Sequence, residues 1–171
     1  VGGTCLNEGC IPTKSFCKNA EVLDGLREAG AFGVTGLSYG FDFGAVTARK
    51  NAVVEQLRDG VEGLLSHKNI TLVRGKAAFK DDHTVLADGQ EYTADYIIIA
   101  TGSVSASLPI PGADLPGILT SREVLDLQEV PKRLCVIGGG VIGLEFASVF
   151  RSFGSEVTVL EYFKDILPRF D

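Results

Sequence analysis

The stretch RLCVIGGGVIGLEFASVFRSFGSEVTVLE, residues 133–161, restricts the possible folds more than any other part of the 171-residue chain. Apolar side chains predict a strand over residues 134–137, directly before a run of glycines. A helix is expected over residues 141–153, because apolar residues recur there at helical spacing, namely Ile142, Phe146, Val149, Phe150 and Phe153. A second strand is expected over residues 156–160. These elements in this order predict a βαβ unit and therefore an α/β fold.

The glycine run has the spacing G-x-G-x-x-G, which is typical of dinucleotide-binding turns. Its candidate binding residues are Gly138, Gly139, Gly140, Val141, Ile142 and Gly143. The first glycine of the motif permits a tight turn, the second lets the backbone approach a pyrophosphate, and the third lets the helix lie close to the strand. Glu161 ends the second strand, where a carboxylate accepts hydrogen bonds from ribose hydroxyls and favours NAD over NADP. The alternative is a glycine-rich turn in an unrelated α/β domain.

Two cysteines near the start of the chain, Cys5 and Cys10, have three interpretations: a structural disulfide, part of a metal site or a redox-active pair. In a regular helix their Cα atoms would be about 8.6 Å apart, whereas a disulfide needs less than about 7 Å. A disulfide therefore requires an irregular backbone, which Gly9 permits, and Pro12 can open the helix that follows. A structural bond closing so short a loop would stabilise little. A zinc site would need about four ligands, and no other cysteine or histidine has ligand spacing to this pair, so no metal site is expected.

Four cysteines in 171 residues are too few for a disulfide-rich secreted protein and favour a reducing compartment, the cytoplasm. Cys17 is expected to pack as a plain thiol, and Cys135 is expected in the core because it lies in an apolar strand. The net charge of −6 disfavours a nucleic-acid surface. No apolar run approaches the ~20 residues of a membrane span.

The middle of the chain predicts two helices and then a small antiparallel sheet. Helical spacing extends over residues 13–29 and again around residues 46–64. Short β-type runs follow, divided by turn signals that include Asp88-Gly89, and they predict a β-meander. Its last strand is expected over residues 96–100, where the run of three isoleucines predicts burial on both faces. A short helix with Thr120 or Ser121 as its N-cap is expected after a connector.

The segment GGTCLNEGCIPTK resembles the redox-active segment of the flavin-dependent pyridine nucleotide–disulfide oxidoreductases. IIIATGS (residues 97–103) and VIGGGVIGLEFA (residues 136–147) are similar, in the same order, to motifs of the flavin domain and of the inserted NAD domain of that family. The resemblance implies part of an FAD-binding Rossmann-like domain with a redox disulfide over residues 1–110. It further implies a connector with a short helix over residues 111–130 and the first βαβ unit of an NAD-binding Rossmann domain over residues 131–171.

The same resemblance implies an internal fragment, because three features of the family are not found in this sequence. They are the first FAD-binding glycine motif, a later flavin-binding Gly-Asp motif and a C-terminal dimer domain with a His–Glu acid–base pair. His67 and His83 are not assigned that catalytic role. The full-length parent is expected to be a homodimer. The fragment alone is expected to be inactive and to bind FAD weakly or not at all.

The resemblance also implies roles for individual residues. Cys10 would lie next to the flavin as the charge-transfer thiolate, and Cys5 would be the interchange thiol. Lys14 would lie near the flavin N5, although without the motif it would be read as an exposed helix lysine. Glu145 would lie near the nicotinamide, or it is simply a favourable charge near a helix N-terminus. Further FAD contacts are implied for Gly3, Thr4, Ala77, Thr101, Gly102 and Ser103.

Within the family, CLNEGCIPTK, the third glycine of the turn and Glu161 are most similar to the NAD-linked members that oxidise dihydrolipoyl groups. Such members pass electrons from the dithiol to the cysteine pair, then to FAD and then to NAD⁺. Their partner would be a lipoyl-bearing protein of a 2-oxoacid dehydrogenase or glycine cleavage complex. Glu8 stands where an apolar residue is more usual. The alternatives are another flavoenzyme of the family, such as mercuric or glutathione reductase, or a non-enzymatic NAD-binding module.

Overall fold

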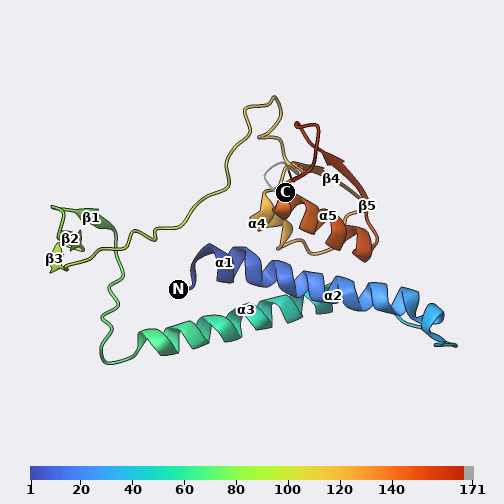
Figure 1. The fold of residues 1–171 in the computed structure, drawn as a ribbon, viewed down its shortest axis with the longest axis horizontal. Coiled ribbons are helices and arrows are strands. Elements are labelled where there is room, and N and C mark those ends of the chain that lie inside the picture. Colours follow the sequence, from blue (N-terminus) through green and yellow to red (C-terminus); the bar gives the residue numbers. More distant parts are fainter. Residues whose placement is uncertain (168–171) are drawn as a thin grey trace.

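The computed structural model describes residues 1–167, whose helices and strands fall into three groups along the chain (Figure 1). The first group is helical: α1 (Gly3–Glu8), α2 (Cys10–Glu28), the short 3-10 helix η1 (Ala29–Phe32) and α3 (Phe43–Leu65). The second is a small sheet of β1 (Ala77–Phe79), β2 (Thr84–Ala87) and β3 (Gln90–Thr93). The third contains α4 (Ser121–Val124), β4 (Arg133–Ile137), α5 (Val141–Phe153) and β5 (Glu156–Leu160). The predicted mixture of helices and strands is confirmed.

The long helices α2 and α3 run antiparallel and lie side by side (Figure 1). Three apolar residues of the predicted face of α2 are buried, namely Phe16, Ala20 and Leu23. Helix α3 begins after Asp42, whose carboxylate accepts a hydrogen bond from the Ala45 N–H at 3.1 Å and so caps the helix. The second half of α3 is more exposed than the first, with Leu57 and Leu64 41% and 71% exposed.

The βαβ unit forms over the residues that the sequence predicts. Strands β4 and β5 pair in parallel from Arg133↔Glu156 to Ile137↔Leu160, and α5 connects them. Gly154 ends α5 at a φ of 110°, a conformation that favours glycine. The expectation that Cys135 lies in the core is wrong: along β4 residues alternate, and Cys135 is on the exposed side of the two-stranded sheet.

The core lies where α2, α3 and α5 meet. Phe16, Phe43 and Phe153 come from these three helices, and their ring centroids are 5.7–5.9 Å apart. The apolar face of α5 is buried as predicted, except that Ile142 in its first turn is 60% exposed. Helix α2, which begins at Cys10, is therefore docked directly on the helix that follows the glycine turn.

Lys50 is a charged residue within this packed region. The helical pattern places it among the polar residues of α3, yet it is only 4% exposed. Its ammonium donates hydrogen bonds to the Leu125 carbonyl at 2.9 Å and to Asp126 Oδ1 at 3.3 Å. These bonds satisfy the buried charge and fasten α3 to the segment after α4.

The β-meander forms with β2 in the middle, antiparallel to both neighbours. Asp88 and Gly89 make the tight turn between β2 and β3 with positive φ values of 48° and 79°, as a hairpin turn of this type requires. The sheet lies apart from the helices at the end of extended connecting segments (Figure 1).

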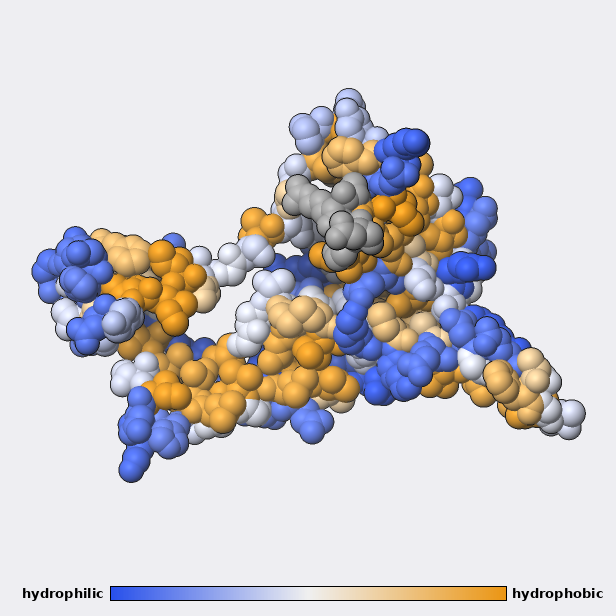
Figure 2. All heavy atoms as spheres, in the orientation of Figure 1, coloured by the Kyte–Doolittle hydropathy of each residue, from blue (hydrophilic) through white to orange (hydrophobic). Residues whose placement is uncertain are grey.

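The predicted last strand, residues 96–100, does not form. Ile98 and Ile99 are 89% and 70% exposed, and this stretch has no regular secondary structure. A strand buried on both faces needs paired neighbours and covering layers, and within residues 1–167 no strand pairs with this segment. Figure 2 shows apolar surface on the small sheet and along the helices below it. Among the helices of residues 1–167, none combines the length and apolarity that a membrane span requires.

Candidate redox and nucleotide-binding site

The cysteine pair lies at a break between two helices. Helix α1 ends at Glu8 and α2 starts at Cys10, with Gly9 between them at φ −137° and ψ −111°. A Cβ atom on Gly9 would lie 3.0 Å from the Thr4 carbonyl oxygen and 3.3 Å from the Cys5 Cα. Glycine is therefore needed because the chain folds back closely on itself. The predicted irregular backbone between the cysteines is confirmed.

Cys5 and Cys10 are both exposed and are free thiols, so the structure shows the reduced form of the pair. A hydrogen bond to the Cys10 side chain raises the pKa of Cys5, and partial desolvation and the charge of Cys10 act in the same direction. The two sulfur atoms are thus neighbours, and Cys5 holds its proton more firmly than an isolated cysteine does. An exposed, adjacent dithiol of this kind is accessible to a disulfide-containing or dithiol substrate.

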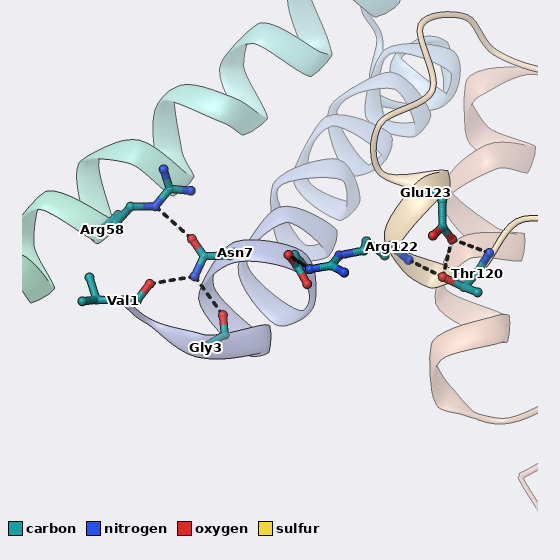
Figure 3. Close-up of polar contacts among 8 residues, drawn as sticks. Val1, Gly3, Asn7, Arg58, Thr120, Arg122 and Glu123 are labelled. Carbon is teal, nitrogen blue, oxygen red and sulfur yellow. Dashed lines mark hydrogen bonds and ion pairs between the residues drawn. The ribbon is translucent and has the colours of Figure 1, made fainter. Parts of the chain in front are cut away.

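Two side chains at the end of α1 anchor the segment between the cysteines, residues 6–9 (called here the cysteine loop), to separate parts of the fold (Figure 3). The Asn7 amide donates to the carbonyls of Val1 and Gly3 at 2.8 and 2.9 Å, and its oxygen accepts from Arg58 Nε at 2.9 Å. Glu8 forms an ion pair with Arg122 of α4. The sequence did not predict these contacts, because nothing in the spacing relates positions 7 and 8 to positions 58 and 122.

Lys14 and Glu145, two predicted site residues from distant parts of the sequence, form an ion pair. The hydrogen bond to the Glu145 carboxylate raises the pKa of Lys14. Cys17 lies close to both groups: burial, followed by the Glu145 charge, raises the pKa of its thiol. The structure therefore brings the start of the cysteine helix and the start of α5 together at one place.

The glycine turn has the geometry that its motif predicts. Gly138 has a φ of 114°, and a Cβ atom on Gly143 would collide with the Gly138 carbonyl oxygen, so the third glycine allows the close approach of helix to turn. A Cβ atom on Gly140 would meet nothing within 4 Å, and no side chain caps α5. The backbone at the start of α5 is therefore open to a phosphate group, to which helix N–H groups are well suited. These residues fit a dinucleotide.

Glu161 is held against this turn. Its carboxylate accepts hydrogen bonds from the Phe163 N–H at 2.8 Å and from the Gly139 N–H at 2.5 Å. These two bonds lower the pKa of Glu161. The acid is thus ionised beside the glycine turn, which is where a ribose-binding carboxylate is required. Its contact with a ribose remains a prediction.

The predicted FAD-binding residues are divided among three places. Gly3 and Thr4 lie in α1 beside the cysteine pair, and Lys14 follows in α2. Ala77 opens the small sheet, and residues 101–103 are in an exposed segment without regular structure, so this structure does not join them to the others in one cradle. Within residues 1–167, no group of three or more His, Cys, Asp or Glu side chains is arranged to hold a metal ion.

An exposed dithiol and a nucleotide-type turn are thus carried on two helices that pack on each other, a combination typical of a nucleotide-linked disulfide oxidoreductase. The sequence profile described as pyridine nucleotide-disulphide oxidoreductase matches residues 1–171, and the chain belongs to this family. Members of the family use FAD and NAD.

Two curated relatives are both named dihydrolipoyl dehydrogenase. Dihydrolipoyl dehydrogenase of Acholeplasma laidlawii is 43% identical over 176 residues, which cover 100% of this chain and 52% of the relative. Dihydrolipoyl dehydrogenase of Bacillus subtilis is 40% identical over 177 residues, covering 100% of this chain and 39% of the relative. The chain thus spans about half or less of the length of these relatives.

A solved structure shows a similar fold. The HOCl-induced flavoprotein disulfide reductase RclA from Escherichia coli matches with a TM-score of 0.81 and 38% sequence identity. The match covers 100% of this chain and 36% of that protein. The predicted family and fold class are confirmed.

Proposed function

We propose that the chain carries the redox-disulfide and NAD-binding portions of a dihydrolipoyl dehydrogenase. The observation that carries the proposal is the exposed Cys5–Cys10 dithiol at the start of the helix that docks on the nucleotide-binding helix α5. The curated relatives support this choice within the family. The net reaction is oxidation of a dihydrolipoyl group to a lipoyl group with reduction of NAD⁺ to NADH and release of one proton.

The cysteine pair would accept two electrons by thiol–disulfide exchange. One substrate thiolate attacks the Cys5 sulfur of the oxidised pair, which forms a mixed disulfide and releases the Cys10 thiolate. The second substrate thiol then attacks its own mixed-disulfide sulfur, which closes the lipoyl ring and releases Cys5. The raised pKa of Cys5 favours its reprotonation as it leaves. Bound FAD would supply the step that takes the electron pair from the dithiol to NAD⁺.

The other residues of the site have binding and positioning roles in this proposal. Gly138 and Gly140 would let the turn approach the NAD pyrophosphate at the start of α5, Gly143 would keep α5 close to the turn, and Glu161 would bind the ribose hydroxyls. Lys14 would lie near the flavin N5 and stabilise charge there, with Glu145 fixing its position. The FAD contacts of Gly3, Thr4, Ala77, Thr101, Gly102 and Ser103 remain predictions.

The partner would be a lipoyl-bearing protein of a 2-oxoacid dehydrogenase or glycine cleavage complex, and the protein would act as a homodimer. We place the reaction in the cytoplasm, where a reducing environment lets such a pair cycle rather than persist as a permanent bond. The predicted domain limits, residues 1–110, 111–130 and 131–171, are part of the same proposal.

The decisive experiment measures NADH formation from NAD⁺ and dihydrolipoamide by the full-length protein with FAD bound. Activity is expected, and Cys5→Ser and Cys10→Ser should each abolish it. An enzyme that instead oxidises NADH only with another disulfide or with a metal ion would be one of the other reductases of the family. A protein that binds NAD but forms no reversible Cys5–Cys10 bond would be a binding module.

A further inference from the structure

The loop that separates the two cysteines contains a charged side chain that the redox chemistry described above does not use. Glu8 immediately precedes the helix break at Gly9, and it forms an ion pair with Arg122 (Figure 3). The side chains are 34% and 58% exposed, so the pair lies at the surface between α1 and α4. An ion pair so placed connects the cysteine loop to a part of the chain more than a hundred residues away.

Arg122 is held on a rigid support. The Thr120 hydroxyl accepts from the Arg122 N–H at 3.3 Å, and the Glu123 carboxylate accepts from the Thr120 N–H at 2.7 Å, which together cap α4. Two residues at the end of this short helix, Val124 and Leu125, are 8% and 3% exposed in the core. The backbone at Arg122 is therefore held in place by α4, and the ion pair restrains the position of Glu8.

The opposite side of the loop is restrained as well. Asn7 is bonded to Arg58 of α3 and to the carbonyls of Val1 and Gly3. Asn7 and Glu8 are thus bonded to two different helices, α3 and α4. Gly9, which separates Glu8 from Cys10, lies close against the Thr4 carbonyl. Such a restrained loop keeps the two thiols close together when they are reduced, and proximity favours formation of the intramolecular bond.

We propose that Glu8 and Arg122 are positioning residues whose ion pair fixes the cysteine loop to α4 and thereby favours closure of the Cys5–Cys10 disulfide. This inference rests on the proposed function, because it assumes that the pair cycles between dithiol and disulfide. With oxidised glutathione as the oxidant, the dithiol loses two electrons and two protons, one disulfide forms in the protein, and two molecules of reduced glutathione are released. The ion pair acts on the equilibrium constant of this exchange.

The test measures that constant in the 171-residue chain, by equilibration with reduced and oxidised glutathione, alkylation and mass spectrometry. Tryptic cleavage after Lys14 gives a peptide of residues 1–14 that contains Cys5 and Cys10 and no other cysteine. Glu8→Gln and Arg122→Gln are each expected to lower the constant about threefold, a size typical of an exposed ion pair. This change corresponds to a reduction potential about 14 mV less negative.

The pattern across variants separates positioning from a simple charge effect. Loss of positioning predicts shifts in the same direction for both single variants and no further shift in the double variant. Arg122→Lys should restore most of the constant, and about 1 M salt should remove the difference from the unaltered chain by screening. Glu21→Gln, which removes a comparable surface ion pair with Lys18 on α2, should leave the constant unchanged.

Three outcomes would overturn the inference. Opposite shifts in Glu8→Gln and Arg122→Gln would show that the charges act directly on the thiolates. Unchanged constants, or additive shifts in the double variant, would show that the pair does not restrain closure. Circular dichroism of each variant verifies that helix content is retained. Absence of any reversible Cys5–Cys10 bond in the unaltered chain would instead overturn the proposed function together with this inference.

Discussion

Lys14 on α2 and Glu145 on α5 form an ion pair across the interface between the cysteine helix and the nucleotide-binding unit. The two residues are 131 positions apart in the chain. The aromatic core formed by Phe16, Phe43 and Phe153 brings their helices together. The contact therefore joins the two chemical parts of the molecule, the dithiol and the nucleotide turn.

Glu145→Gln is expected to make Lys14 more reactive toward acylating reagents at pH 9–10. The Glu145 hydrogen bond raises the pKa of Lys14, so its removal leaves more of the reactive neutral amine. Because the pKa of Lys14 is higher in the folded chain than the ordinary lysine pKa of 10.5, its ion pair stabilises the fold fully at pH values below 10.5. This stabilisation is lost as the pH rises through the pKa of Lys14 in the folded chain. Peptide mass spectrometry measures the acylation rate, and the rate at Lys18 serves as the internal control. An unchanged Lys14 rate would contradict the prediction.

Gly9→Ala is expected to destabilise the chain by about 1–3 kcal/mol, the usual effect of forcing an extra methyl group against fixed atoms. Its Cβ would press on the Thr4 carbonyl oxygen, a backbone atom that cannot move away freely. Gly25→Ala is the matched control within α2, because its Cβ meets no other atom. That substitution should stabilise the helix by about 0.5–1 kcal/mol. Urea unfolding measures both, and equal effects would argue against the close approach at Gly9.

Alanine at two glycines of the nucleotide turn should have separable effects. Gly143→Ala should unfold the βαβ unit at lower temperature, because its Cβ collides with the Gly138 carbonyl. Gly140→Ala should change stability by less than about 1 kcal/mol, because its Cβ points into open space, yet it should weaken NAD binding by occupying the place of the pyrophosphate. Thermal unfolding and NAD titration distinguish the two. Undiminished NAD binding by a folded Gly140→Ala variant would contradict the proposed site.

Lys50→Met is expected to lower the free energy of unfolding by about 1–3 kcal/mol, because it leaves the buried Leu125 carbonyl without its hydrogen-bond donor. Lys18→Met is the control, since Lys18 is exposed on α2, and it should change stability by less than about 0.5 kcal/mol. Chemical denaturation compares the two variants. Equal stability of both would show that the Lys50 ammonium does not fasten α3 to the segment after α4.

Glu161→Gln should reduce the loss of stability in acid. Hydrogen bonds from the Phe163 and Gly139 N–H groups lower the pKa of Glu161 below its ordinary value of 4.5. A carboxylate whose pKa is lowered by folding stabilises the folded chain at pH values above its pKa in the unfolded chain. This stabilisation is lost as the pH falls through its pKa in the folded chain. The unaltered chain should therefore lose melting temperature below about pH 4.5 more steeply than the variant. Parallel melting curves across this range would contradict the proposed hydrogen bonds.

Most elements were predictable because their signals are local. Periodicity and glycine spacing identify the βαβ unit, the Asp88-Gly89 turn and the irregular backbone at Gly9, since each depends only on neighbouring residues. The strand predicted over residues 96–100 was wrong, because burial depends on what packs against a segment. The same reason explains the exposed Cys135 and the buried Lys50.

The sequence alone determined the chemistry available to this protein: two thiols separated by a glycine-containing segment, and a glycine turn followed by an acid. Only the tertiary structure decided which groups act together. Packing of phenylalanines from three helices places Lys14 against Glu145, and burial of Val124 and Leu125 in the same core brings Arg122 to Glu8. No local pattern encodes such pairs, because they depend on how distant helices dock, and docking follows from the summed burial of many apolar side chains rather than from any single residue.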